Sequence, residues 1–444
     1  MMEIKTAKAL KGELRFPGDR VQGQLICALS LLAQGVSRIG NWTRSQEWEP
    51  ILAFLEKNGA AVTAGPSELA IAALPGMRER TDWTLENDLP QPFAMAFLSL
   101  LAGLSTAARP VRVKLAPALR SRLSPVLDAL KQGGFDHRDE SDSESVLSFV
   151  GQRPLRKKPS AVGLRRTVWT LACTTSSLPL EFEEIGPSHD LLENVYPLFG
   201  LSVQSTAEAD APDLDPEMAK RLQKRQKRQN RTLRIEPARQ IPSVDVNLQG
   251  DVQLASWAAV CACLRRGSEV VLKDVTHPSC RGAVFAGLRK MGADLEFVKK
   301  SEARGVPSVD IKVKASHLLG RKFDAADVAG LSEAAPFLTM AATHADRETV
   351  LGGLGALREG AVDQLDALAG NLRSLGLSVG VFPEGLVLRG EDDVVAERLD
   401  AHEHEALALA LHALGTSTAG RTVLENASCL EFHWPALADL EGRE

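Results

Sequence analysis

An apolar segment of about ten residues, followed by a short run of β-branched residues, recurs six times along the chain. The apolar segments are residues 25–33, 93–102, 167–176, 254–264, 336–344 and 406–414. They are apolar nearly all round but too short to cross a bilayer, which is typical of helices buried in a protein core. The runs that follow are rich in Val, Ile and Thr and predict strands. A repeat of this length constrains the fold more strongly than any local pattern.

A second predicted helix follows each of these strands and ends at or near a glycine. The clearest copies end at Gly59, Gly134, Gly292 and Gly376. Glycine suits the left-handed backbone conformation that commonly follows the last turn of a helix. The repeating unit is therefore helix, strand, helix, strand. Six units predict an α/β (α+β) chain of two domains with three units each.

The buried helices also indicate a class of ligand. Parallel helices add their dipoles, and their N-terminal ends carry partial positive charge. If these ends face one cleft, we expect the cleft to attract anions.

Composition excludes several classes of protein. The net charge of −5 gives no global reason to expect nucleic acid or a membrane surface as partner. No apolar run reaches the roughly 18 residues of a membrane span, and the mixed charge of residues 1–20 is not that of a signal peptide. We therefore expect a cytoplasmic location. The six cysteines lack paired C-x-x-C motifs and are interpreted as buried, reduced thiols.

One charged segment, residues 205–235, interrupts the repeat. Residues 208–217 are acidic, and residues 220–231 carry seven Lys or Arg. The simplest interpretation is a solvated helical hairpin, with a protein contact through residues 208–231 as the alternative. Nucleic acid is disfavoured because no aromatic residues are interleaved to stack on bases.

Several motifs, in order along nearly the whole chain, resemble those of the enolpyruvyl transferase family. Residues 10–20 (LKGELRFPGDR) resemble the opening strand that ends in P-G-S-K-S, and residues 123–134 resemble the segment after a phosphoenolpyruvate-binding arginine. Pro187-Ser-His-Asp with Glu193 is similar to S-R-D-H-T-E. Residues 333–336 (EAAP) resemble D-E-x-P, and residues 357–363 keep the frame of L-R-V-K-E-S-D-R.

The resemblance implies a fold and a reaction. Each domain is expected to be an inside-out α/β barrel, with residues 1–19 plus 245–444 in one domain and 20–244 in the other. The branch that the motifs resemble moves an enolpyruvyl group from phosphoenolpyruvate to shikimate 3-phosphate. Both substrates are anionic, so cations must hold them and a base must take the hydroxyl proton. No cofactor is expected.

The site residues follow from the same resemblance. Glu333 stands where the family has a catalytic aspartate, and Arg20 stands where it has a lysine. The residues expected to bind the anionic substrates are Arg20, Arg122, Arg166, Thr167, Ser188, His189 and His404. A metal is not expected at His402-x-His404, because residues two apart do not share a helix face.

Much of the family's charged set is nevertheless replaced. The substituted positions are Leu25, Leu89, Pro92, Ala96, Gly360, Ala361 and Gln364. Loss of one preorganised charge typically lowers a rate by about a hundred- to a thousandfold. The leading hypothesis is a diverged homologue, a pseudoenzyme candidate with lost or altered catalysis. Two alternatives stay open: an active transferase with a changed acceptor that uses Arg20, Arg122 and Glu333, and a non-catalytic scaffold.

Overall fold

The computed structural model describes the chain except for 14 stretches. These are residues 7–8, 142–145, 156–158, 162, 185–190, 208–230, 278–280, 302–305, 326–329, 359–361, 392–393, 396, 419 and 433–444. Residues 208–230 of the charged insertion predicted at 205–235, and the predicted binding residues Ser188 and His189, therefore lie outside the described residues. Residues 205–207 and 231–235 of that insertion lie in two antiparallel strands, Val203–Ala207 and Arg231–Ile235.

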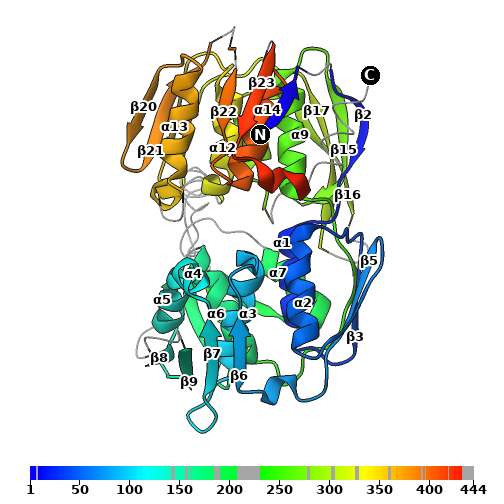
Figure 1. Cartoon of the computed structure of the whole chain (residues 1–444), viewed down its shortest axis with the longest axis vertical. Coiled ribbons are helices and arrows are strands. Elements are labelled where there is room, and N and C mark those ends of the chain that lie inside the picture. The colour runs from blue at the N-terminus through cyan, green and yellow to red at the C-terminus, as the bar shows by residue number, and fades with distance from the viewer. Residues whose placement is uncertain are drawn as a thin grey trace, which may run out of the picture. The chain divides into compact units, whose positions relative to one another are not determined.

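The chain divides into two compact units (Figure 1). Unit 1 comprises Met1–Asp19 and Gln249–Glu444, and unit 2 comprises Arg20–Leu248. The chain thus returns from unit 2 to unit 1 after residue 248, whereas the sequence analysis predicted this boundary after residue 244. The reason is β14 (Asp245–Asn247), which pairs in parallel with β3 (Val36–Gly40) and so belongs to unit 2.

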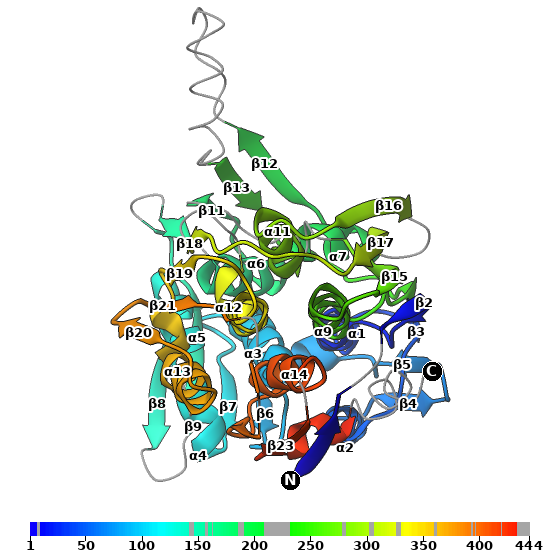
Figure 2. The same cartoon turned by 90° about the horizontal axis from the view of Figure 1, so that it is seen from above.

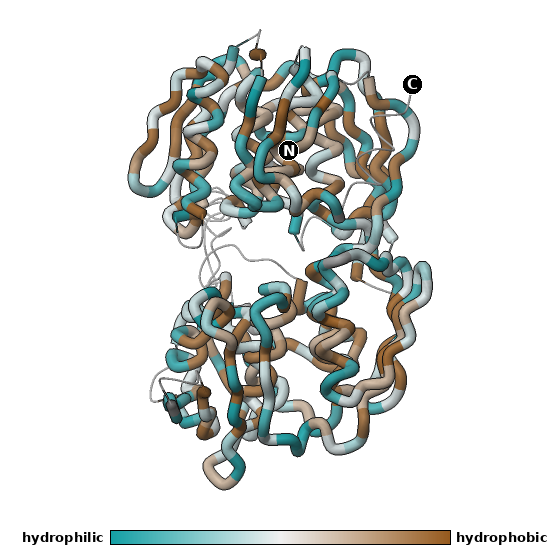
Figure 3. Tube along the Cα trace, viewed as in Figure 1, coloured by the Kyte–Doolittle hydropathy of each residue, from teal (hydrophilic) through white to brown (hydrophobic). Residues whose placement is uncertain are grey.

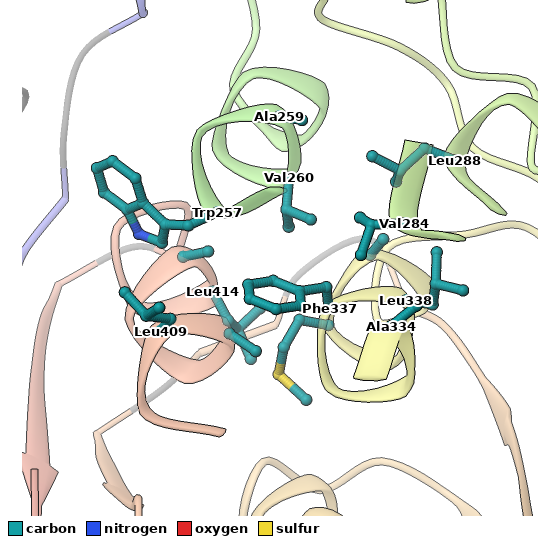
Figure 4. Close-up of a cluster of buried hydrophobic side chains, with 14 of the residues drawn as sticks. Trp257, Ala259, Val260, Val284, Leu288, Ala334, Phe337, Leu338, Leu409 and Leu414 are labelled. Carbon is teal, nitrogen blue, oxygen red and sulfur yellow. The ribbon is translucent and has the colours of Figure 1, made fainter. Parts of the chain in front are cut away.

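Three buried helices form the centre of unit 1: α9 (Val252–Leu264), α12 (Leu331–Ala342) and α14 (Glu405–Gly415). Figure 2 looks nearly along them, with the sheets of this unit around them. Figure 4 shows Trp257, Phe337 and Leu414 among the apolar side chains that fill the space between the helices. The predicted buried character of these segments is confirmed.

The contacts between α9 and α14 show that these two helices run parallel. Trp257 Nε1 donates to His412 Nδ1 at 3.1 Å, and Cys261 Sγ lies 3.6 Å from Thr416 Oγ1. Both steps advance four residues in the same direction. The apolar contact between α9 and α14 therefore contains two polar pairs, which determine which face of each helix packs against the other.

The buried helices of unit 2 are α1 (Arg20–Ser30), α3 (Gln91–Leu104) and α6 (Leu164–Thr175). Helices α3 and α6 approach closely because Gly103 has no side chain. A Cβ at Gly103 would lie 1.9 Å from the carbonyl oxygen of Ala172. Thr175 Oγ1 donates to the carbonyl of Leu100 at 2.6 Å across the same contact.

Each buried helix is followed by a strand, as predicted. These strands are β3 (Val36–Gly40), β7 (Val111–Leu115), β11 (Leu180–Glu184), β15 (Glu269–Thr276), β19 (Glu348–Gly352) and β23 (Arg421–Glu425). Figure 3 shows polar and apolar residues alternating along β7, whose Val111, Val113 and Leu115 are buried. This alternation is that of a sheet with one face on the core.

Each of these strands is central in one of the six sheets that the described strands form. Five of these sheets have four strands. In each of them the central strand pairs in parallel with one neighbour and antiparallel with the second strand of a hairpin. The parallel neighbours are β14, β6 (Asp82–Leu85), β10 (Ser160–Ala161), β2 (Lys11–Arg15) and β18 (Lys322–Asp324). The hairpins are β4 (Ala61–Ala64) with β5 (Glu68–Ala72), β8 (Phe135–Ser141) with β9 (Val146–Gln152), β12 (Val203–Ala207) with β13 (Arg231–Ile235), β16 (Leu295–Ser301) with β17 (Ser308–Lys314), and β20 (Val379–Phe382) with β21 (Gly385–Arg389).

The sixth sheet joins the two ends of the chain. Strand β23 pairs in parallel with β22 (Arg398–Asp400) and antiparallel with β1 (Met2–Lys5). The first strand therefore completes the last repeat, which explains why the chain's beginning and its second half share unit 1.

The outer helices end where the glycines predicted. Four are α2 (Glu49–Lys57), α5 (Ser124–Gln132), α11 (Ala283–Lys290) and α13 (Gln364–Ser374). Gly59, Gly134, Gly292 and Gly376, which follow them, have positive φ of 94°, 85°, 95° and 80°. Only glycine adopts this conformation at little cost, so the sequence signal has a direct physical cause.

Candidate functional site

In unit 2, Arg20 begins α1 and already has an acidic partner. Its Nη1 donates to Glu47 Oε2 at 2.8 Å, and Gln24 Nε2 donates to Glu47 Oε1 at 2.5 Å. The side chains of Arg20 and Glu47 are only 11% and 19% exposed. Shielding from solvent strengthens this pair, so the charge of Arg20 is neutralised within the fold.

Arg122, the predicted phosphoenolpyruvate ligand, closes the short helix α4 (Pro117–Arg122). Its Nη2 donates to the carbonyl oxygens of Asn87 at 2.5 Å and Leu89 at 3.4 Å. The neighbouring Arg120 pairs with Asp139 at 2.5 Å. The guanidinium of Arg122 thus stabilises the loop before α3 through two backbone carbonyls.

Arg166, in the first turn of α6, belongs to a buried ionic cluster with Glu184, Glu193 and Arg231. Arg166 pairs with both glutamates, and Arg231 pairs with Glu184 and with Glu193, the latter at 2.7 Å. Arg166 and Glu184 are 5% and 2% exposed. Two positive and two negative charges balance, which is the usual condition for keeping charges in a protein interior.

The sequence predicted Arg166 as a ligand for an anion, but its partners were not apparent. Glu184 ends β11, Glu193 lies in α7 (Leu191–Val195) and Arg231 begins β13. The neighbouring Thr167 Oγ1 has a long contact, 3.5 Å, to the carbonyl of Gly163.

In unit 1, Glu333 lies in the first turn of α12 and is 55% exposed. Its Oε2 is 3.5 Å from Nε of Arg281, a side chain that is 8% exposed. Arg281 Nη1 lies 3.3 Å from each carboxylate oxygen of Asp19, which is fully buried. The sequence reasoning missed Arg281 and Asp19 as site residues. Arg281 lies outside the motifs quoted above, and the opening motif that contains Asp19 gives no sign of a partner 262 residues away.

His404 is the N-cap of α14. Its Nδ1 accepts from the backbone N–H of Leu407 at 3.4 Å, and burial lowers the pKa of the ring. A neutral imidazole can accept this bond and a protonated one cannot. His404 therefore stabilises the helix as an uncharged group.

A groove of about 680 Å³ also lies in unit 1, along α13 and β22. Asp363, Asp366 and Asp400 line it together with Arg398 and His402. The acidic side chains outnumber the cations, and Asp363 already pairs with Arg358 at 2.6 Å. Arg398 pairs with Glu425 at 3.1 Å, so the described residues of this groove offer no unpaired arginine to two anionic substrates. Within the described ranges, no group of three or more His, Cys, Asp or Glu could hold a metal ion.

Comparison with solved structures defines the class of fold. EPSP synthase from Acinetobacter baumannii superimposes with a TM-score of 0.75 at 18% identity, over 99% of this chain and 97% of that one. The enolpyruvyl transferase NikO from Streptomyces tendae gives a TM-score of 0.65 at 16% identity, over 99% and 96% of the two chains. The fold is therefore that of the enolpyruvyl transferases.

Sequence comparison then defines the family. The model described as EPSP synthase (3-phosphoshikimate 1-carboxyvinyltransferase) matches residues 217–440, and the chain belongs to this family. The 3-phosphoshikimate 1-carboxyvinyltransferase of Desulforudis audaxviator is 28% identical, over 98% of this chain and 97% of the relative. That of Desulforamulus reducens is 23% identical over 98% and 97%. Among the described helices, none is both long and apolar enough to cross a membrane.

Proposed function

We propose that this chain is a diverged member of its family that has lost or changed the transfer of enolpyruvyl from phosphoenolpyruvate to shikimate 3-phosphate. One observation carries the proposal. The arginines predicted to hold substrate anions in unit 2 are engaged with acceptors of the protein itself: Arg20 with Glu47, Arg122 with backbone carbonyls, and Arg166 with Glu184 and Glu193.

These contacts oppose anion binding for a physical reason. An incoming phosphate would have to displace a carboxylate and leave it near the same arginine without its partner. Removing one member of a buried ion pair typically costs about 3–5 kcal/mol. A phosphate bound at Arg166 would meet part of that penalty, because Glu184 is 2% exposed and would keep only Arg231 as a partner.

A second candidate is an active transferase with a changed acceptor. The observation that favours it is Glu333, a carboxylate that is 55% exposed beside a buried arginine. A carboxylate in this setting can accept the proton of an acceptor hydroxyl. In this candidate, Glu333 is the general base and the acceptor differs from shikimate 3-phosphate.

The test is calorimetric titration with phosphoenolpyruvate and shikimate 3-phosphate, separately and together, followed by a phosphate-release assay. The Desulforudis audaxviator relative, assayed in parallel, is the positive control. We expect neither binding heat nor phosphate release from this chain. Binding of both compounds with phosphate release would overturn the proposal.

The second candidate is tested by offering phosphoenolpyruvate with a panel of other hydroxylated acceptors. Phosphate release with one of them, abolished in Glu333→Gln, would establish a changed acceptor. No release with any member of the panel would count against it.

A further inference from the structure

We propose that Arg281, anchored by Asp19, is the positioning residue for Glu333. The proposal rests on the second candidate above, in which Glu333 accepts a proton. It concerns three side chains of unit 1 that are 262 and 52 residues apart in sequence, since Asp19 pairs with Arg281 and Arg281 with Glu333.

Asp19 provides a rigid anchor. Its carboxylate is fully buried and accepts from the backbone N–H of Val252 at 3.3 Å, at the N-terminal end of α9. Its own N–H donates to the carbonyl of Gln249 at 2.7 Å. A carboxylate at this end of a helix is stabilised by the helix dipole, and these contacts hold Asp19 in one place.

Arg281 links the buried Asp19 to the exposed Glu333. Nη1 contacts both oxygens of Asp19 at 3.3 Å, which directs the Nε edge of the planar guanidinium at Glu333. Arginine is always protonated in proteins, so this charge does not change with pH. The fork of donors lets one side chain serve two carboxylates, which a lysine cannot do with fixed geometry.

Glu333 receives orientation more than stability from this contact. At 3.5 Å the pair is longer than a strong charge-assisted hydrogen bond, and a pair whose carboxylate is 55% exposed contributes little to folding. Arg281 therefore narrows the directions in which the exposed carboxylate of Glu333 can point.

The test is carbodiimide labelling with an amine nucleophile, read at Glu333 by peptide mass spectrometry. We expect Arg281→Gln and Asp19→Asn to raise the labelling rate of Glu333 about two- to fivefold, the range for losing one exposed ion pair. The matched control is Arg358→Gln, which removes another arginine of unit 1 that pairs with two carboxylates, Asp363 and Asp366. It should leave Glu333 unchanged.

An unchanged rate at Glu333 in Arg281→Gln would overturn the proposal, and so would an equal rise at Glu333, Glu348 and Glu384, which would indicate general loosening. If Arg281→Gln does not fold, Arg281→Lys replaces it, with a smaller rise expected because the charge remains. If an acceptor supports phosphate release, Arg281→Gln should lower kcat about tenfold with little change in KM. Failure of turnover in the unmodified chain would count against the second candidate alone, because labelling does not need turnover.

Discussion

At the scale of single residues, a positive charge at a predicted binding position can already have a partner within the protein. Arg20 and Arg166 keep positive charge at predicted binding positions, yet each is paired with glutamate inside the fold. An arginine that is already paired with a glutamate is not available to bind an anionic ligand unless that glutamate is displaced. The state of each arginine is therefore decided by its neighbours in space.

The buried cluster around Arg166 gives the first prediction. Glu184→Gln removes one charge while Arg166 and Arg231 remain, so we expect the free energy of unfolding to fall by about 3–5 kcal/mol. Urea denaturation followed by tryptophan fluorescence measures it. The exposed pair of Arg234 with Glu181, 48% and 46% exposed, is the control, and Glu181→Gln should change stability by less than about 1 kcal/mol. Equal effects in both variants would contradict the stabilising role of burial.

His404 gives a pH-dependent prediction. Burial lowers its pKa in the folded chain, with Glu405 opposing this more weakly. The unfolded chain, with an ordinary histidine pKa of about 6.5, then binds the proton more readily, so the free energy of unfolding falls as pH drops below that value. His404→Asn keeps a capping acceptor without a titrating ring. Urea titrations at about pH 7.5 and about pH 5.5 should show a smaller loss in the variant than in the unmodified chain. An identical loss in both would exclude His404 as the titrating group.

At the scale of elements, the closeness of helices is set by small residues. Gly103 allows α3 to meet α6, whereas Gly370, in α13, has open space where a Cβ would lie. The helix contact therefore requires glycine at position 103, whereas no described atom near Gly370 excludes a side chain there.

This contrast predicts opposite effects of one substitution. Gly103→Ala places a methyl group 1.9 Å from the Ala172 carbonyl, and we expect a loss of about 1–3 kcal/mol from overpacking. Gly370→Ala should raise the free energy of unfolding by about 0.5–1 kcal/mol, because alanine loses less backbone entropy than glycine when a helix forms. Thermal unfolding of both variants measures the difference. A stabilised Gly103→Ala would show that the α3–α6 contact is looser than described.

At the scale of the whole molecule, the first strand closes the last repeat. β1 pairs with β23 from Met2↔Leu424 to Lys5↔Arg421. Removing β1 leaves an edge of β23 unpaired next to α14. A sheet with a newly exposed edge loses both hydrogen bonds and cover for its apolar face.

We therefore expect deletion of residues 1–5 to loosen one unit only. Backbone amides of β23 and α14 should exchange with deuterium at least about tenfold faster, while those of α3 and α6 in unit 2 remain protected. Hydrogen exchange with mass spectrometry measures both in one experiment. Equal acceleration in both units, or none in β23, would contradict the assignment of β1 to the last repeat.

Local patterns were sufficient to predict the architecture. The six apolar segments overlap α1, α3, α6, α9, α12 and α14, although α1 and α12 each begin five residues earlier than predicted. The glycines after the outer helices adopt the positive φ that the sequence predicted. Such signals are local because helix periodicity, β-branching and glycine's freedom act within a few residues. Glu333 was also indicated by its motif, and the structure places it exposed at the start of α12.

The sequence by itself therefore determined the repeat, its helices and strands, and the family to which the chain belongs. Only the tertiary structure decided what the charged residues do. Arg166 meets Glu184, Glu193 and Arg231 from three other elements, and Arg281 joins Asp19 to Glu333. No periodicity encodes such meetings, because an ion pair depends on distance in space between residues that can be far apart along the chain.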